Sequence, residues 1–321
     1  METHGAPYQL VHRADLHSAL LDAAKRVGVT ILSNKQVVDY DFDAPSATTA
    51  GGEIFRADLL IAADGIKSIS RPLMTGNTHK PRDTGDVAYR ILLPGETLRR
   101  DPDLIGLLDD PCVNVWCGPG AHFIGYPIRQ GELFNIVICS TTKSEFTDEI
   151  WVVEGDNREL RERFSSWEPR VTKLCALAEN FMKWRLCDVP NVPTWVHSSG
   201  KACLLGDSCH PMLPYLAQGA AQAFEDAASL RRCLSEAHDI KTALQRYQDI
   251  RMARVMLVQA KTREHQHIWH VPDGMDQLAR DDLMGRDAEE NPVFWGHTER
   301  QKWLFGHDPE ILDKEGANRR E

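Results

Sequence analysis

The chain has 321 residues, of which 42% are hydrophobic and 26% are charged, an ordinary balance for a globular protein of about two domains. Its formal net charge of −10 disfavours nucleic acid as a partner. No apolar run reaches the roughly 18 residues of a membrane span, and the first residues lack the apolar segment of a signal peptide. We therefore expect a cytoplasmic protein that has no membrane partner.

The first quarter of the chain predicts a helix followed by strands. Residues 13–27 form an amphipathic pattern whose apolar side consists of Leu16, Leu20, Ala23, Ala24 and Val27. Residues 29–40 and 53–55 are expected to be strands around a polar loop at 44–52. The apolar run 58–63 is short and ends in a turn signal, which is typical of a buried parallel strand.

From about residue 86 the pattern changes to short strands separated by turn residues. Residues 87–93, 112–116, 121–127 and 133–140 have the composition and spacing of an antiparallel sheet.

The rest of the chain is mainly helical. Helices are expected at 157–167 and 169–182, and then at 219–236 and 239–265. The tail at 271–321 is expected to be irregular.

The eight cysteines are scattered without a metal-binding spacing. The closest pairs are Cys112 with Cys117 and Cys203 with Cys209, and neither pair forms a C-x-x-C motif. We expect reduced thiols and no metal site, as is usual for a cytosolic enzyme.

The most informative stretch spans residues 204–220. It predicts a buried strand, a turn at Gly206 and Asp207, a proline-stiffened loop and the first turn of a helix. The glycine lets the backbone approach a ligand closely, and the carboxylate can accept hydrogen bonds from sugar-type hydroxyls. The N–H groups of Gly219 and Ala220 would open the helix and favour negative charge there.

A second motif follows the apolar run 58–63. Asp64 and Gly65 stand at its carboxyl end, where ligands of parallel sheets bind, and Ser68 and Arg71 come shortly after. An Asp-Gly pair alone is more often a simple turn. The preceding strand and the two later residues favour a ligand-binding loop here.

Both motifs resemble those of the single-component, NAD(P)H-dependent flavoprotein monooxygenases, and in particular the salicylate-hydroxylase-like aromatic hydroxylases. The family pattern G-D-x-x-H-P-x-x-P-Y-x-A-Q-G-A is matched throughout from Gly206, and E-D-A follows at 225–227. Residues 64–71 resemble the family's D-G-x-x-S-x-x-R motif. The resemblance implies an FAD-dependent enzyme that uses NAD(P)H and O2 to hydroxylate a small aromatic substrate, phenolic or aryl-carboxylate.

The resemblance also implies which residues contact FAD. These are Arg13, Asp64, Gly65, Gly206, Asp207, Pro214, Gly219 and Ala220. Arg13 enters this group because Arg13 to Leu16 resembles the family's R-x-x-L helix.

Three catalytic candidates come from the same resemblance. His122 and Tyr126 are four residues apart on an expected strand, so both face the same side, as do a histidine base and a substrate-binding tyrosine in related hydroxylases. Without the resemblance, two half-buried strand side chains explain them equally well. Gln218 is expected to hydrogen-bond the substrate or the flavin. His210 is expected to bond backbone, and Arg90 either pairs with a substrate carboxylate or is simply exposed.

The family's N-terminal βαβ unit, with its glycine-rich dinucleotide fingerprint, has no counterpart in this sequence. The nearest glycine cluster, Gly118 and Gly120, is followed by Phe123 where the motif needs glycine, and by no helix pattern. A truncated gene, an expressed fragment or a decayed copy would explain this; the alternative is a chain repurposed without full FAD affinity. In either case we expect this chain alone to bind FAD weakly or not at all, so that it can be inactive by itself.

The predicted fold is α/β, an incomplete FAD/NAD(P)-binding Rossmann-like domain with an inserted substrate domain and C-terminal helices. The FAD-binding domain comprises 1–82 and 200–270, the substrate domain with its antiparallel sheet is 83–199, and 271–321 is a tail. Two other functions stay open: a same-fold epoxidase or oxygenase of secondary metabolism, and a non-catalytic remnant. No motif encodes the substrate, the position hydroxylated, the choice of NADH or NADPH, or the oligomeric state.

Overall fold

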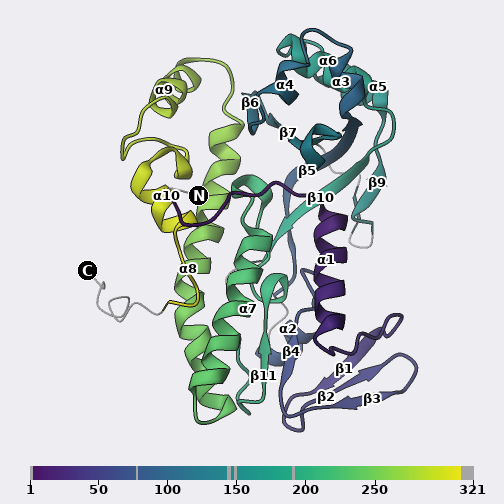
Figure 1. Ribbon diagram of the computed structural model, residues 1–321, viewed down its shortest axis with the longest axis vertical. Coiled ribbons are helices and arrows are strands. Elements are labelled where there is room, and N and C mark those ends of the chain that lie inside the picture. The colour runs from purple at the N-terminus through teal and green to yellow at the C-terminus, as the bar shows by residue number, and fades with distance from the viewer. Residues whose placement is uncertain (1–2, 77–78, 143–145, 148–149, 190–191, 312–321) are drawn as a thin grey trace. The chain divides into compact units, whose positions relative to one another are not determined.

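The computed structural model describes residues 3–76, 79–142, 146–147, 150–189 and 192–311 (Figure 1). The chain divides into two compact units. Unit 1 consists of Met1–Ile31, Asp83–Leu186 and His267–Arg286, and unit 2 consists of Leu32–Arg82, Cys187–Gln266 and Asp287–Glu321. The domain boundaries drawn from the sequence stay predictions, because compactness alone assigns no role to either unit. Among the described residues, no helix is both long and apolar enough to cross a bilayer.

Unit 1 is built on a six-stranded sheet with the order β6-β7-β8-β5-β10-β9. Its strands are β5 (Arg82–Pro94), β6 (Asn114–Gly118), β7 (Ala121–Ile128), β8 (Leu133–Thr141), β9 (Val152–Glu154) and β10 (Met182–Asp188). Strands β6, β7, β8 and β5 pair antiparallel in that order, which confirms the predicted antiparallel sheet.

One face of this sheet carries the core of unit 1. Every second residue of the central strands is apolar and buried there, including Tyr89, Phe123 and Ile138. Helices α5 (Asn157–Arg163) and α6 (Pro169–Leu177) contribute to the same cluster through their own apolar side chains. The period of two therefore sends His122 and Tyr126 of β7, and Arg90 of β5, to the opposite side, which we call the polar face.

The remaining helices of unit 1 are α1 (Arg13–Arg26), α3 (Gly95–Arg99), α4 (Gly106–Asp109) and α9 (Met275–Met284). The helix predicted at 13–27 is confirmed, and Gly28 follows it with a φ of +83°. None of its residues is buried, and Leu20 and Val27 on its apolar side are 47% and 80% exposed. Helix α1 is held in unit 1 by an exposed ion pair between Asp15 and Arg129.

Unit 2 contains a parallel strand pair and a small antiparallel sheet. Strands β4 (Leu60–Ala62) and β11 (Ala202–Leu204) pair in parallel, so the strand ends before Asp64 and Asp207 lie side by side. The small sheet is formed by β1 (Val37–Asp41), β2 (Ser46–Thr49) and β3 (Ile54–Arg56).

Three helices complete the centre of unit 2. They are α2 (Ser70–Thr75), α7 (Gly219–Glu236) and α8 (Ile240–Trp269), and α7 and α8 lie side by side (Figure 1). Their buried faces pack with β11 into one cluster that contains Leu204, Leu230 and Tyr247. Near the end of the chain, Phe294 and Leu304 pack against Leu216 and Val258.

Four predicted elements are wrong. The strand expected at 29–40 begins only at Val37 and forms β1 to Asp41, and residues 29–36 are not a strand. The loop expected at 44–52 contains β2, whose polar residues form a strand because backbone bonds on both sides hold it. Helix α6 ends at Leu177, and residues up to 182 lead into β10. The tail is not irregular, since it forms α9 and α10 (Thr298–Phe305) and buries apolar side chains; residues 312–321 lie outside the described part.

Candidate functional site

Two loops leave the carboxyl ends of the parallel strands β4 and β11, where open α/β sheets bind ligands. Ser208 ties the two strand ends together. Its hydroxyl donates to the carbonyl of Ala62 at the end of β4, at 2.7 Å, and accepts from the backbone N–H of Leu205, at 3.0 Å. A single buried side chain therefore sets the spacing of the two loops.

The loop after β11 is shaped by Gly206, which has a φ of +64° in the left-handed region that favours glycine. Its backbone N–H donates to Asp226 Oδ2 at 3.0 Å. The next residue, Asp207, is exposed while its neighbours on both sides are buried. This places one carboxylate at the surface of an otherwise packed turn.

The loop after β4 is held by its own motif residues. The Asp64 carboxylate accepts from the backbone N–H of Ile69 and from the N–H and hydroxyl of Ser70, so it stabilises the start of α2. Gly65 adopts a φ of +78°. The predicted contact of Asp64 and Gly65 with a cofactor stays a prediction; the structure gives Asp64 a structural role.

Arg71 connects the two loops. It is 1% exposed and donates to the carbonyls of Ser208, Ile66 and His79, at 2.9, 2.8 and 3.2 Å. Burial lowers the pKa of Arg71, although the nearby Asp64 carboxylate opposes that effect. Because three carbonyls share the guanidinium, this arginine fixes the shape of the loops.

The proline-rich segment leads directly into α7. Pro214–Leu216 form a short 3-10 helix, and α7 begins at Gly219 without a side-chain cap. Gln218 is 5% exposed, and its Oε1 accepts from Gln222 at 3.3 Å, so its side chain is turned inward. The uncapped N–H groups of Gly219 and Ala220 are suited to a polar or anionic ligand.

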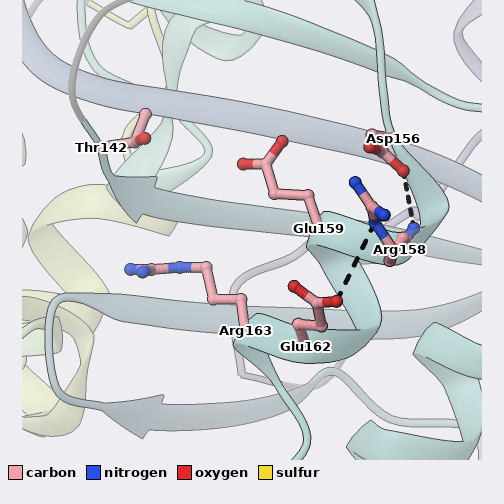
Figure 2. A pocket seen from close by; sticks show the side chains of 6 residues that line it. All are labelled: Thr142, Asp156, Arg158, Glu159, Glu162 and Arg163. Carbon is pink, nitrogen blue, oxygen red and sulfur yellow. Dashed lines mark hydrogen bonds and ion pairs between the residues drawn. The ribbon is translucent and has the colours of Figure 1, made fainter.

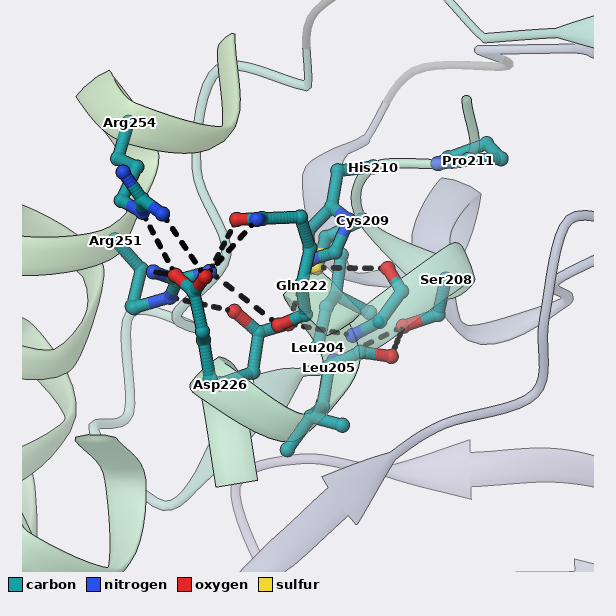
Figure 3. Close-up of polar contacts among 12 residues, drawn as sticks. Leu204, Leu205, Ser208, Cys209, His210, Pro211, Gln222, Asp226, Arg251 and Arg254 are labelled. Atoms are coloured by element: carbon teal, nitrogen blue, oxygen red, sulfur yellow. Dashed lines mark hydrogen bonds and ion pairs between the residues drawn. The ribbon is translucent and has the colours of Figure 1, made fainter. Parts of the chain in front are cut away.

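A buried ionic network supports this segment from behind (Figure 3). Asp226 on α7 is fully buried and accepts from Gly206, from Nε2 of His210 at 2.5 Å and from Nε of Arg251 at 2.9 Å. Arg251 on α8 also pairs with Glu225, which in turn binds Arg254. The network therefore joins the Gly206 turn to both long helices.

The charges of this network are balanced. Burial by itself raises the pKa of Asp226, but the hydrogen bond from His210 and the charge of Arg251 outweigh it, so the pKa of this carboxyl is lowered. The pKa of Glu225 is lowered as well, because its arginine partners outweigh its burial. Both carboxylates therefore stay ionised in the protein interior.

His210 was expected to bond backbone, and this expectation is wrong because its Nε2 meets the Asp226 carboxylate. The E-D-A sequence 16 residues later was the available signal. Arg251 was missed altogether, since nothing in the local sequence of α8 marks it as a partner.

The same region contains the one cluster with metal-ligating geometry found among the described residues, formed by Cys209, His210 and Asp226 within 4.8 Å. The Asp226 carboxylate already accepts hydrogen bonds from Arg251 and from the backbone N–H of Gly206. A cation would have to compete with the guanidinium for the same oxygens. In the structure His210, Asp226 and Arg251 form an ion-pair network.

The other predicted site residues lie in unit 1. His122 is fully buried and Tyr126 partly buried on the polar face, as the period of two predicted. Burial raises the pKa of Tyr126, and the nearby hydroxyl of Tyr8 adds to this. Partial desolvation lowers the pKa of Arg90, and the like charge of Arg13 lowers it further. Arg13 is exposed at the start of α1, and its predicted contact with FAD stays a prediction.

A pocket of about 650 Å³ also opens in unit 1, but none of the predicted residues lines it. Figure 2 shows its charged lining, formed by Thr142, Asp156, Arg158, Glu159, Glu162 and Arg163. Several of these charges are already engaged, for example Asp156 with the N–H of Arg158 and Glu159 with Lys183. A wide, charged pocket of this kind does not suit a small aromatic ring.

The loops of unit 2 fit a flavin dinucleotide. Asp207 offers an exposed carboxylate for hydroxyl groups, Gly206 leaves the backbone open for close approach, and the uncapped start of α7 offers N–H donors. Pro214 stiffens the segment between them. These features are the donor and acceptor types that a flavin and its ribityl chain need.

Comparison with known proteins agrees with this geometry. The model of the FAD binding domain family matches residues 1–262. The FAD-dependent monooxygenase OpS4 of Beauveria bassiana is 36% identical over 98% of this chain and 75% of its own length. The 3-hydroxybenzoate 6-hydroxylase 1 of Aquipseudomonas alcaligenes is 33% identical over 96% and 75%. A solved salicylate hydroxylase substrate complex has a TM-score of 0.76 and 28% identity, covering 93% of this chain and 73% of its own.

We expect Asp226→Ala to lower the free energy of unfolding by about 3–5 kcal/mol, because it leaves Arg251 buried without its carboxylate. Urea denaturation followed by circular dichroism measures the loss. Asp249→Ala, at an exposed position on the neighbouring α8, is the control and should change stability by less than about 0.5 kcal/mol. Equal effects of the two substitutions would contradict the assigned role of Asp226.

The Asp226 contribution should also depend on pH. Its pKa is lower in the folded chain than in the unfolded chain, so its stabilising effect is complete above the unfolded value of about 3.9 and is lost as the pH falls through the folded value. Stability should therefore fall more steeply below about pH 4 in the parent chain than in Asp226→Ala.

Proposed function

The chain belongs to the FAD binding domain family, and we propose that its substrate is a small aryl carboxylate that carries a phenolic hydroxyl. In its general kind the chain is an FAD-dependent aromatic monooxygenase, as are the relatives and the solved neighbour described above. FAD, when bound and reduced by NAD(P)H, supplies the activation of O2. The finer assignment of substrate and residues is our proposal.

The polar face of unit 1 supports this substrate class. Arg90 lies on β5, two strands from β7, in the row between His122 and Tyr126. The two β7 residues are separated by about 13 Å, since a strand rises about 3.3 Å per residue. One small ring with a carboxylate and a hydroxyl can therefore be shared among these side chains.

Electrostatics favour an anion beside Arg90. Partial desolvation and the like charge of Arg13 lower the pKa of this arginine, and Cys139 and Tyr126 oppose this only in part, so its charged form gains from further compensation. An incoming carboxylate would provide it through charge-assisted hydrogen bonds. The name of the 3-hydroxybenzoate hydroxylase relative points to the same class of substrate.

Each of the three side chains on the polar face has its own role in the proposed reaction. Arg90 binds the carboxylate, Tyr126 hydrogen-bonds the ring substituent, and His122 accepts the phenolic proton. His122 is fully buried, so water does not compete for that proton. In unit 2, Asp207, Gly206 and the start of α7 hold FAD.

In a version of the chain restored with the family's N-terminal βαβ unit, we expect Asp207→Ala to abolish stable FAD binding, because it removes the exposed carboxylate acceptor of the Gly206 turn. The flavin absorbance of the purified holoenzyme and the quenching of free FAD fluorescence report the loss. Asp109→Ala, which removes an exposed carboxylate from α4 in unit 1, is the control and should leave flavin content unchanged. A full flavin content in Asp207→Ala would refute the assignment.

The experiment that tests the substrate class is Arg90→Met. It should weaken the binding of 3-hydroxybenzoate by roughly 10–100-fold, since a hydrogen bond to a charged group contributes about 1.5–3 kcal/mol, and leave the binding of neutral 3-hydroxybenzyl alcohol unchanged. Calorimetry measures both ligands. Arg158→Met, in the charged pocket of Figure 2, should affect neither. If it is instead Arg158→Met that loses the carboxylate, the substrate lies in that pocket.

For His122→Gln in the same restored version we expect FAD to stay bound while ring hydroxylation slows by about 10²–10⁴-fold, the usual contribution of a general base. NAD(P)H consumed without hydroxylated product should rise, because the ring is no longer activated in time. Rapid-mixing kinetics and product analysis on the holoenzyme separate the two effects. Parental rate and coupling would make His122 a structural strand residue.

A further inference from the structure

His122 is packed against a short chain of polar side chains within unit 1. Its Nδ1 lies 2.9 Å from Nε2 of His270, and the two rings are 5.1 Å apart. His270 Nδ1 lies 3.4 Å from Asp86 Oδ2 and 3.4 Å from Oγ1 of Thr141. Asp86 comes from β5, Thr141 from the end of β8 and His270 from the residue after α8, so three remote segments meet here.

The segment that carries His270 is anchored rather than loosely placed. Its backbone carbonyl accepts from the N–H of Gly120, at 3.1 Å, just before β7. Trp269 is 2% exposed and lies with its ring 5.9 Å from that of His122. The imidazole of His270 is 7% exposed, and the Asp86 side chain is fully buried.

Counting protons assigns the direction of each contact. The Thr141 hydroxyl donates its one proton to Asp86 Oδ1, at 2.7 Å, so its oxygen can only accept from His270. The Asp86 carboxylate is also an acceptor. His270 Nδ1 therefore faces two acceptors and carries a proton, which leaves a lone pair on Nε2 of the neutral ring.

That lone pair determines the state of the next ring. His270 Nε2 accepts, so His122 Nδ1 must donate to it. We propose that Asp86 and His270 are positioning residues that fix His122 in the Nδ1-protonated tautomer and make its Nε2 the basic atom, while Thr141 only donates to the Asp86 carboxylate. The inference rests on the proposed function in one respect only, namely that His122 is the base.

The surroundings keep His270 neutral, as this assignment requires. Burial lowers the pKa of His270, and the charges of Arg163 on α5 and His267 on α8 lower it further, whereas Asp86 opposes them. Among the described residues, these charged groups act on the ring from β5, α5 and α8. A neutral His270 can accept from His122, whereas a doubly protonated one could not.

The proton transfer that follows is balanced. The substrate's phenolic O–H bond breaks, its electron pair stays on the oxygen as phenolate, and the proton forms the new N–H bond at His122 Nε2. The imidazolium keeps its Nδ1–H on His270, whose own Nδ1–H points to the Asp86 carboxylate. The negative charge at the end of the chain then stabilises the positive ring.

The tautomer is directly observable by NMR of the full chain labelled with ¹⁵N-histidine, without FAD or turnover. At pH 8 we expect the His122 signals to show a protonated Nδ1 and an unprotonated Nε2, with the assignment taken from the signals lost in His122→Gln. In Asp86→Asn an amide N–H replaces an acceptor, so we expect the His122 proton to move to Nε2. Asp109→Asn, at an exposed position of α4, should change nothing.

A protonated Nε2 in the parent chain overturns the inference, whatever the variants do. An unchanged His122 tautomer in folded Asp86→Asn overturns it as well. If Asp86→Asn does not fold, Thr141→Val decides: Asp86 still accepts from His270, so the tautomer must persist, and a shift to Nε2 would contradict the role of Asp86. The expected tautomer together with parental hydroxylation by His122→Gln would sink the proposed base but leave the tautomer assignment standing.

Discussion

The geometry of the candidate FAD loops depends on the hydrogen bonds and the ion pair that the buried carboxylate of Asp226 forms. A charge in the protein interior is tolerated only when partners replace its water, and Asp226 has three kinds: a backbone N–H from Gly206, an imidazole from His210 and a guanidinium from Arg251. Each partner comes from a different place, namely the turn after β11, the loop before α7 and the middle of α8. Satisfying one carboxylate therefore fixes three segments at once.

Most residues of the two motifs are likewise engaged in contacts within the protein, which leaves few of them to contact a ligand. Arg71 directs its donors to loop carbonyls, Asp64 stabilises the start of α2, and Ser208 ties β4 to β11. These residues stabilise the scaffold. In our proposal, the exposed carboxylate of Asp207 and the uncapped start of α7 are left to contact FAD. A long motif can thus identify a family strongly while several of its residues serve to stabilise the loops.

The local sequence pattern was sufficient to predict those helices, strands and turns that are encoded by neighbouring residues. The strand, turn and helix around Gly206, the parallel pair of β4 and β11 and the antiparallel sheet follow from apolar period and turn residues. It failed where a segment depends on remote partners, as in the polar strand β2 and the packed helices of the tail. Contacts such as His122 with His270 span 148 positions, and no local signal marks them.

Each unit contains a buried carboxylate in contact with a histidine side chain, but the two contacts have different roles. In unit 2 the Asp226 carboxylate also pairs with Arg251, which neutralises its charge locally. The His210–Asp226 contact therefore stabilises the shape of the loop. In unit 1 the Asp86 carboxylate accepts from the hydroxyl of Thr141 and faces the imidazole of His270. In the arrangement proposed above, this carboxylate orients the line of rings that leads to His122. A carboxylate–histidine pair can therefore stabilise a loop where the imidazole ends the contact, and orient a base where the imidazole passes the contact on to a second ring.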